Sequence, residues 1–155
     1  MTNELVIRPD DLRAEDVIGL LQAHLALMRS LSPYESTHAL DLDGLRQDDI
    51  TVWRAEQAGK LVGCAALKEL DSTTGEIKSM HTAEAHRGKG IAAALLRHLL
   101  QTARTRGYQE LYLETGSQPG FQAARSLYAQ YGFVECPPFA SYREDPNSYY
   151  MTLRL

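Results

Sequence analysis

The first third of the chain shows a helical pattern between polar stretches. Apolar side chains recur at spacings of three and four residues over Asp16–Leu31, which predicts one amphipathic helix. Asp16 is the expected N-cap of this helix, and Ser32-Pro33 ends it. A short apolar run at Leu5–Arg8 comes before the helix and is followed at once by a proline. We therefore expect an edge strand that stops at this proline.

The middle of the chain changes to short apolar runs with a strand-like composition. Three such runs follow one another at Thr51–Glu56, Leu61–Leu67 and Glu76–Thr82. Turn-forming residues at 58–60 and 71–75 separate them. Because these connections are short, the three runs predict an antiparallel meander.

The second half begins with the strongest helical pattern in the sequence. Apolar residues repeat every fourth position over Ile91–Thr105, and Gly107 is a suitable residue to end that helix. The remaining predicted elements are a strand at 111–114, a helix at 122–131, and strands at 133–136 and 149–155. The pattern as a whole predicts a mixed α/β fold that forms a single domain over residues 1–155.

Composition narrows the classes of function. The chain has 155 residues, of which 44% are apolar and 23% are charged, so a disordered, collagen-like or coiled-coil protein is excluded. The formal net charge is -4, and a negatively charged protein is a poor binder of the negatively charged backbone of nucleic acids. No nucleic-acid partner is therefore expected. No stretch approaches roughly 18 consecutive apolar residues, and the start of the chain does not resemble a signal peptide. We therefore expect no membrane contact and a cytoplasmic location.

The sequence offers little support for metal or disulfide chemistry. Its two cysteines, Cys64 and Cys136, form no C-x-x-C pair, and its five histidines are scattered. We expect reduced thiols and no bound metal.

A glycine-rich basic loop lies between the last strand of the meander and the strong helix. It reads Arg87-Gly88-Lys89-Gly90-Ile91-Ala92. Amide N–H groups at a helix start have no partner within the helix, and the helix dipole adds partial positive charge there. Because glycines let the backbone approach an anion closely, this loop predicts a phosphate-binding site.

Two nucleotide-binding motifs compete for the loop. A Walker loop is excluded because no Gly-Lys-Ser/Thr is present. A dinucleotide fingerprint fits literally as Gly88-x-Gly90-x-x-Ala93, with Glu114 in the place of its ribose-binding acid. The unit lies late in the chain, however, and residues 115–155 are too few to complete a doubly wound sheet. An NAD(P)-binding oxidoreductase-like domain is therefore kept as an alternative.

The same loop resembles the acyl-CoA signature of the GNAT superfamily of N-acetyltransferases. That signature is Q/R-x-x-G-x-G/A, matched at Arg87, Gly90 and Ala92. The segment Ala124–Phe133 resembles the A-x-x-L-Y-x-x-x-G-F ending of the same superfamily. The order of the predicted elements is similar over nearly the whole chain. One departure is Phe121, which stands where the family often has an asparagine on the pantetheine side.

This resemblance implies a mixed, mostly antiparallel sheet flanked by helices. It also implies direct transfer of an acetyl group from acetyl-CoA to a primary amine of a small molecule or peptide. The run Glu114–Ser117 is similar to an uncharacterised bacterial subgroup, and because many relatives pair through their final strands, a homodimer is expected. The residues implied to contact acetyl-CoA are Met80, Thr82, Arg87, Gly88, Lys89, Gly90, Ile91, Ala92 and Tyr128. A CoA-binding module without turnover is a second alternative.

An amine acceptor must lose a proton before it can attack. A lysine-like ammonium has a pKa near 10.4, so only about one molecule in 2500 is neutral at pH 7, a penalty of roughly 4.6 kcal/mol. The resemblance implies Glu76 as the general base, because a glutamate at the start of this strand often has that role in the family. His81 is five residues further along and is expected on the opposite face of the strand. His81 and ordered water rank behind Glu76.

The resemblance also implies partners for the other reacting atoms. The Met80 amide is the implied donor to the oxyanion, and the backbone of Met80 and Thr82 is expected to pair with pantetheine. Tyr128 matches the family tyrosine that protonates the leaving thiolate, and Tyr131 is its nearest substitute. The residues expected to bind the acceptor are Tyr34, His38, Glu76 and Tyr142.

Overall fold

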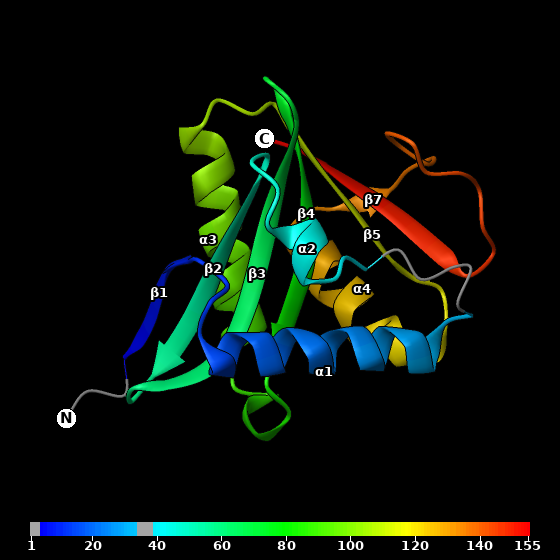
Figure 1. Cartoon of the computed structure of the whole chain (residues 1–155). Helices are drawn as coiled ribbons and strands as arrows, with labels where there is room; N and C mark the ends of the chain where they lie inside the picture. The colour runs from blue at the N-terminus through cyan, green and yellow to red at the C-terminus, as the bar shows by residue number, and fades with distance from the viewer. Residues whose placement is uncertain (1–3, 34–38) are drawn as a thin grey trace.

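A seven-stranded sheet runs through the centre of the molecule (Figure 1), in a computed structural model that describes residues 4–33 and 39–155. Its strands are β1 (Leu5–Asp10), β2 (Ile50–Gln57), β3 (Lys60–Asp71), β4 (Thr74–Thr82), β5 (Glu110–Gly116), β6 (Val134–Glu135) and β7 (Ser148–Arg154). They lie in the order β1-β2-β3-β4-β5-β7-β6, and within the described sheet only β4 and β5 are parallel neighbours. A doubly wound parallel sheet is thus not formed, and the NAD(P)-binding alternative is wrong.

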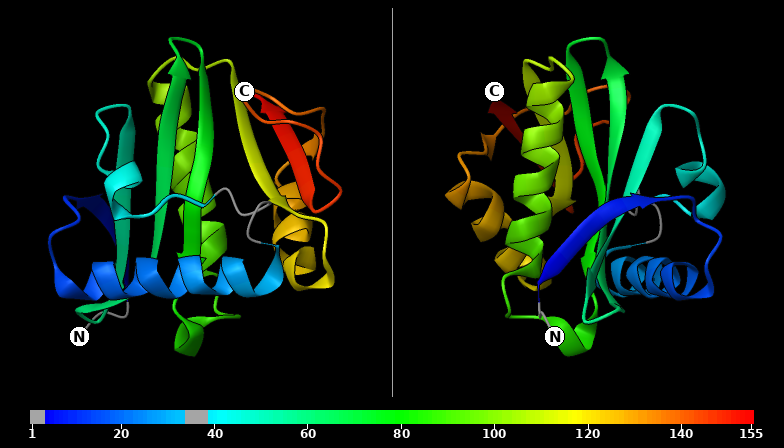
Figure 2. Two further views of the ribbon diagram at one scale, coloured as in Figure 1. Left: turned by 45° about the vertical axis from the view of Figure 1, so that its right-hand side comes forward. Right: turned by 90° about the vertical axis from the view of Figure 1, so that its left-hand side faces the viewer.

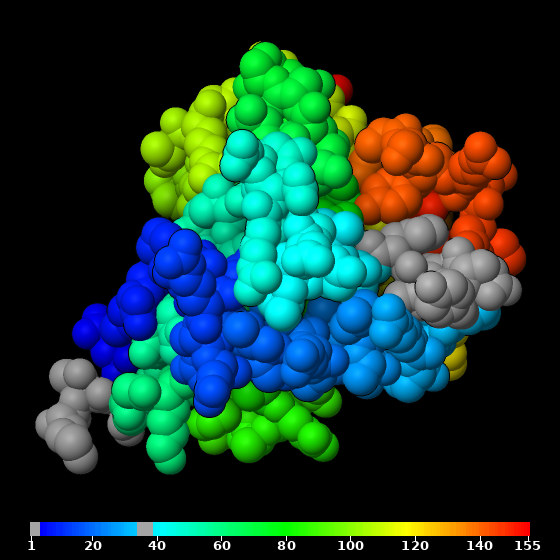
Figure 3. All heavy atoms as spheres, viewed as in Figure 1, coloured from blue at the N-terminus to red at the C-terminus, as the bar shows by residue number. Residues whose placement is uncertain are grey.

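Helices cover both faces of this sheet. They are α1 (Glu15–Leu31), α2 (Leu42–Leu45), α3 (Ile91–Thr105) and α4 (Gln122–Gln130), with 3-10 turns η2 (Glu84–His86) and η3 (Pro119–Phe121). Figure 2 shows α1 and α2 on one face and α3 and α4 on the other. Figure 3 looks onto the α1 face, where α1 and the cyan segment around α2 cover much of the sheet. None of the helices in the described ranges has both the length and the apolar character needed to cross a bilayer.

Each face of the sheet has its own apolar core. On the α3 face, Leu95 is fully buried and packs in one cluster with Leu67 of β3. On the α1 face, Val17 is fully buried and packs in a second cluster with Ala66 of β3. Successive residues of a strand point to opposite faces, so the central strand β3 contributes to both cores. The middle of the sheet is thus packed on both faces, and the strands there hold the residues of the site in place.

Two expectations about the start of the chain were wrong. Strand β1 does not stop before Pro9 but continues through it to Asp10. Because β1 is an edge strand, one side of its backbone needs no partner, and a residue without an N–H is tolerated there. The N-cap of α1 is Ala14 and not Asp16, whose carboxylate lies in the first helical turn and pairs with Arg54 instead.

Strands β4 and β5 run side by side over only part of their length. Thr74–Ile77 pairs with Glu110–Leu113, and the register between the two strands ends there. Beyond that point β4 continues alongside β3, and β5 continues alongside β7. The two strands therefore form a fork in the middle of the sheet.

Candidate active site

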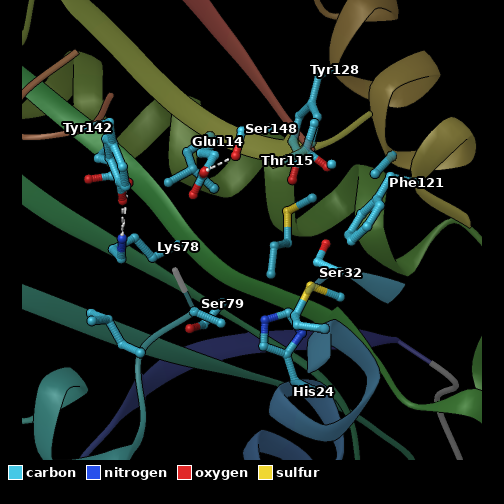
Figure 4. Close-up of a pocket in the computed structure, with 18 of the residues that line it drawn as sticks. His24, Ser32, Lys78, Ser79, Glu114, Thr115, Phe121, Tyr128, Tyr142 and Ser148 are labelled. Carbon is cyan, nitrogen blue, oxygen red and sulfur yellow. Dashed lines mark hydrogen bonds and ion pairs between the residues drawn. The ribbon is translucent and has the colours of Figure 1, made fainter. Parts of the chain in front are cut away.

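A pocket lies where β4 and β5 part, between α1 on one side and α4 on the other (Figure 4). Four of the residues expected at the site line it, namely Glu76, Met80, Tyr128 and Tyr142. The expected residues that do not line it are Thr82, Arg87, Gly88, Lys89, Gly90, Ile91 and Ala92. Tyr34 and His38 lie outside the described residues.

A buried ion pair forms part of the β4 wall. Glu76 is only 3% exposed, and its Oε2 accepts hydrogen bonds from the Tyr142 hydroxyl at 2.6 Å and the Lys78 ammonium at 3.0 Å. The Lys78 ammonium also donates to the Tyr142 oxygen at 2.8 Å. Burial above all, and then the charge of Glu76, raises the pKa of Tyr142, so its phenol stays protonated. Glu76 therefore belongs to a three-residue network and is not an isolated carboxylate.

A β-bulge in β4 changes which residues share a face. The register with β3 passes over Ser79 and Met80, which together stand opposite one residue of β3. Ser79 adopts a left-handed backbone conformation, with φ of 51°. Glu76 and His81 pair with β3 residues four positions apart, so the two side chains lie on the same face. The expectation that His81 faces the opposite side was wrong, because simple alternation does not count the extra residue.

His81 contacts a second histidine at the floor of the pocket. Its Nδ1 lies 3.1 Å from Nδ1 of His24 in α1, and both side chains are buried. Burial lowers the pKa of each ring to about 4, with a smaller effect of His81 on His24 and of Arg87 on His81. Both rings are thus neutral at pH 7. A ring with so low a pKa is a weak base and is poorly suited to take a proton from an ammonium group. Among the residues that the structure describes, no group of three His, Cys, Asp or Glu side chains could hold a metal ion.

Acid is expected to destabilise the fold through this histidine pair. The folded-state pKa of about 4 lies below the reference value of 6.5, so the unfolded chain binds the proton first. The contribution of the two neutral histidines to the free energy of unfolding is fully present above pH 6.5, and it is lost as the pH falls toward 4. At pH 5 the loss is about 2 kcal/mol per histidine by these pKa differences. Urea unfolding at pH 7.5 and pH 5 measures it.

The control for this experiment removes one ring of the pair. His24→Leu keeps an apolar contact at the same place, and only His81 then titrates. Between the two pH values the variant should lose about 2 kcal/mol less stability than the wild type, because burial also lowers the pKa of His98 and that contribution is common to both proteins. An equal loss in both proteins would show that other groups cause the acid sensitivity.

Tyr128 enters the pocket from α4. It is 7% exposed and packs edge-on against Phe133, with ring centroids 5.8 Å apart. Burial raises the pKa of this phenol. Tyr131 follows the last turn of α4, and its oxygen accepts a hydrogen bond from Arg97 at 2.7 Å, outside the pocket. Tyr128 is therefore better placed than Tyr131 to meet a ligand in the fork.

Phe121 also lines the pocket, and its ring lies against Gly116 of β5. A Cβ at Gly116 would stand 2.1 Å from the Phe121 ring, so only glycine leaves room for it. Phe121, the departure from the family pattern in the sequence, thus places an apolar ring in the wall of the pocket.

The glycine-rich loop is exposed at the start of α3. Gly88 and Gly90 have φ of 76° and 81°, and a Cβ at either position would meet no atom within 4 Å. Helix α3 begins without a side-chain cap and without an acidic residue in its first turn, and Ile91 anchors its start in the core. Open backbone, a helix N-terminus and the exposed cations Arg87 and Lys89 fit a diphosphate group.

Sequence analysis missed two charged residues of the pocket. Lys78 stands two positions after Glu76, and strand alternation alone could have placed both on one face. Glu114 was considered only as a ribose-binding acid, but it lines the pocket and its Oε2 accepts a hydrogen bond from the Ser148 hydroxyl at 2.7 Å. Glu114 and Ser148 are brought together by the pairing of β5 with β7, and this long-range pairing leaves no local signal in the sequence.

Comparisons with known proteins agree on one family. Residues 19–133 match the model of the Acetyltransferase (GNAT) family. An uncharacterised N-acetyltransferase of Bacillus subtilis, YsnE, is 50% identical over 96% of this chain and 99% of its own. The solved structure of a Klebsiella pneumoniae protein described as an acyl-CoA N-acyltransferase has a TM-score of 0.83 and 28% identity, covering 99% of both chains. An Elizabethkingia anophelis GNAT acetyltransferase, solved with acetyl-CoA bound, shares the fold with a TM-score of 0.73 and 22% identity, covering 99% of this chain and 100% of that one.

Proposed function

The chain belongs to the GNAT acetyltransferase family and is an acyltransferase, and we propose that it moves an acetyl group from acetyl-CoA directly to a primary amine of a small molecule or peptide. The observation that carries this proposal is the pocket in the β4–β5 fork. Glu76 lines this pocket, its partners Lys78 and Tyr142 lie on one side of it, and Tyr128 lies on the α4 side (Figure 4). An amine acceptor needs a group that takes its proton, and a thiolate leaving group benefits from one that donates.

Acetyl-CoA would be held by two parts of the chain. The glycine-rich loop, with Arg87 and Lys89, offers charge and open backbone to the diphosphate. Past Ile77, β4 no longer pairs with β5, so its backbone around Met80 and Thr82 can receive the pantetheine arm as an added strand would be received. Acetyl-CoA supplies the thioester, and the residues of the fork supply the proton transfers.

Three groups of the pocket have roles in the proposed reaction. Glu76 is the base, and because its side chain is buried, the proton reaches it through the Tyr142 hydroxyl that donates to it. The Met80 amide, at the bulge, is the donor for negative charge that develops on the acyl oxygen. Tyr128 donates a proton toward the leaving sulfur.

A direct test follows thiol release. The protein is incubated with acetyl-CoA and a panel of amino acids, polyamines, aminoglycosides and peptides, and both free CoA and the acetylated product are measured. Amine-dependent thiol release with a matching product mass supports the proposal. Binding of CoA without thiol release from any amine would instead indicate a CoA-binding module without turnover.

Removing the loop arginine is expected to weaken acetyl-CoA binding. Arg87→Ala deletes a charge-assisted contact worth about 1.5 to 3 kcal/mol, so the Kd should rise roughly 10- to 150-fold. Gly90→Val should have a larger effect, because a β-branched residue at φ 81° strains the loop and fills the space beside the helix start. Isothermal titration calorimetry measures both variants.

The matched control lies at the far end of the helix that follows the loop. Arg104 is exposed in the last turn of α3, and Arg104→Ala should leave the Kd unchanged. Equal binding by Arg87→Ala and Arg104→Ala would remove Arg87 from the cofactor site. Native affinity in a folded Gly90→Val variant would place the diphosphate elsewhere.

A further inference from the structure

One lysine of the chain lies inside the fork. The sequence has four lysines, all within the described ranges, and of these only Lys78 lines the pocket. It follows Ile77, the last residue of β4 that pairs with β5, and Figure 4 shows its side chain directed toward Tyr142. The Lys78 side chain is only 9% exposed. Reagents in bulk solvent therefore reach this amine poorly, whereas an acyl donor bound in the fork would lie close to it.

The ammonium of Lys78 already contacts the groups that are assigned to proton transfer. It donates to Oε2 of Glu76, the proposed base, at 3.0 Å and to the Tyr142 oxygen at 2.8 Å. In the proposed reaction the acceptor amine passes its proton to Glu76 through the same hydroxyl. The Lys78 nitrogen is thus one hydrogen bond away from the group that an acceptor amine must meet, and it has a carboxylate base in direct contact.

We propose that Lys78 is a self-acetylation site, modified by acetyl-CoA that is bound in the fork when no acceptor occupies it. The ammonium gives one proton to Glu76, and the neutral nitrogen attacks the carbonyl carbon of the thioester. A C–N bond forms, the C–S bond breaks, and the departing sulfur takes up the second proton that the nitrogen loses. The products are N-acetyl-lysine, CoA and one proton held on Glu76. This assignment rests on the proposed function, because it uses the same donor, pocket and base.

The other three lysines are internal standards for this reaction. Lys60 and Lys89 are exposed, so a chemical reagent in solution reaches them more easily than it reaches Lys78. Lys68 of β3 pairs in register with Glu76 and is half-buried, but it does not line the pocket. Chemical acetylation therefore follows exposure, whereas transfer within the fork selects the least accessible position.

The experiment follows the acetyl group on the protein itself. The protein is incubated with acetyl-CoA and no added amine, and it is then digested with a protease that does not cut at lysine. Mass spectrometry measures the acetylated fraction of each lysine over time. Lys78 should react about tenfold or more faster than Lys60, because a bound donor and an adjacent base together outweigh low exposure. With acetyl phosphate, which lacks the CoA part, Lys60 and Lys89 should react before Lys78.

Three variants connect the modification to the site. With acetyl-CoA below its Kd, Arg87→Ala should slow acetylation of Lys78 by the factor by which calorimetry shows its Kd to rise. Glu76→Gln should lower the ratio of the Lys78 rate to the Lys60 rate by about 100-fold or more, the cost of losing a general base. Because this ratio is measured within one sample, it does not depend on protein concentration, and the melting temperature shows that the variant is folded. Lys60→Arg is the control and should leave the rate at Lys78 unchanged.

Each alternative result has a distinct meaning. An unmodified Lys78, equal rates at Lys78 and Lys60, or the same preference with acetyl phosphate would overturn the assignment. A rate at Lys78 that does not follow the Kd of Arg87→Ala would overturn it as well. Transfer to amines is measured separately by thiol release with the panel above, and transfer without modification of Lys78 overturns this inference alone. Acetylated Lys78 without transfer to any amine of the panel overturns the proposed acceptor alone.

Discussion

Replacing Tyr128 by phenylalanine is expected to lower turnover about 100-fold or more, a typical cost of losing a general acid. The ring is kept, so its packing against Phe133 and the core should survive. The Kd for acetyl-CoA should stay within about threefold, because the hydroxyl acts on charge that develops only in the transition state. Steady-state kinetics and calorimetry on the same preparation give both numbers.

The acidity of Tyr128 sets how this proton can be used. A thiol has a reference pKa of about 8.5 and a phenol about 10, so full transfer to a thiolate is uphill by roughly 2 kcal/mol. Burial raises the pKa of Tyr128 further and makes full transfer less favourable still. The hydroxyl therefore serves as a hydrogen-bond donor to a sulfur whose charge is still developing. Its effect should appear in kcat and not in ground-state binding.

Tyr131→Phe is the matched control for this variant. It removes a tyrosine hydroxyl just beyond the same helix, one that meets Arg97 outside the pocket. Turnover should be unaffected. Weak acetyl-CoA binding with near-normal turnover in Tyr128→Phe would make Tyr128 a binding contact only, and a loss of turnover in Tyr131→Phe alone would transfer the acid role to that residue.

The regular elements of the fold were predictable because their signals are local. Helix α3 begins and ends where its apolar repeat predicts, over Ile91–Thr105. The A-x-x-L-Y motif placed Tyr128 on a helix, and the structure places that helix at the pocket. By contrast, only Val134–Glu135 of the predicted strand at 133–136 is formed. A two-residue strand at a sheet edge depends on its neighbour β7 and not on its own sequence.

The acceptor side of the pocket could not be predicted in the same way. Its geometry depends on the bulge at Ser79, where a non-glycine residue takes a positive φ that leaves no mark in the sequence. It also depends on the loop before β7, which brings Tyr142 against Glu76 from 66 positions away. Such contacts follow from the β5–β7 pairing, so they become visible only once the sheet is assembled.

Replacing Glu76 by glutamine is expected to lower kcat at pH 7 by about 100- to 10,000-fold, the range for loss of a general base. The activity should recover as the pH rises, because a growing share of the acceptor is then neutral without help. For a lysine-like amine the neutral share increases about tenfold per pH unit below 10.4. The pH–rate profile of the variant, compared with that of the wild type, is the measurement.

The structure supplies the control and the competing explanation for this result. Glu69 on β3 also accepts a tyrosine hydroxyl, from Tyr108 at 2.7 Å, but lies outside the pocket, so Glu69→Gln should leave the profile unchanged. Glutamine at position 76 keeps the shape but leaves the Lys78 charge without its carboxylate, a loss that the melting temperature reports. If Glu76 only positions Lys78, KM for the acceptor rises and the pH–rate profile stays parallel to that of the wild type. That outcome would assign the proton transfer to Glu114, the other carboxylate of the fork.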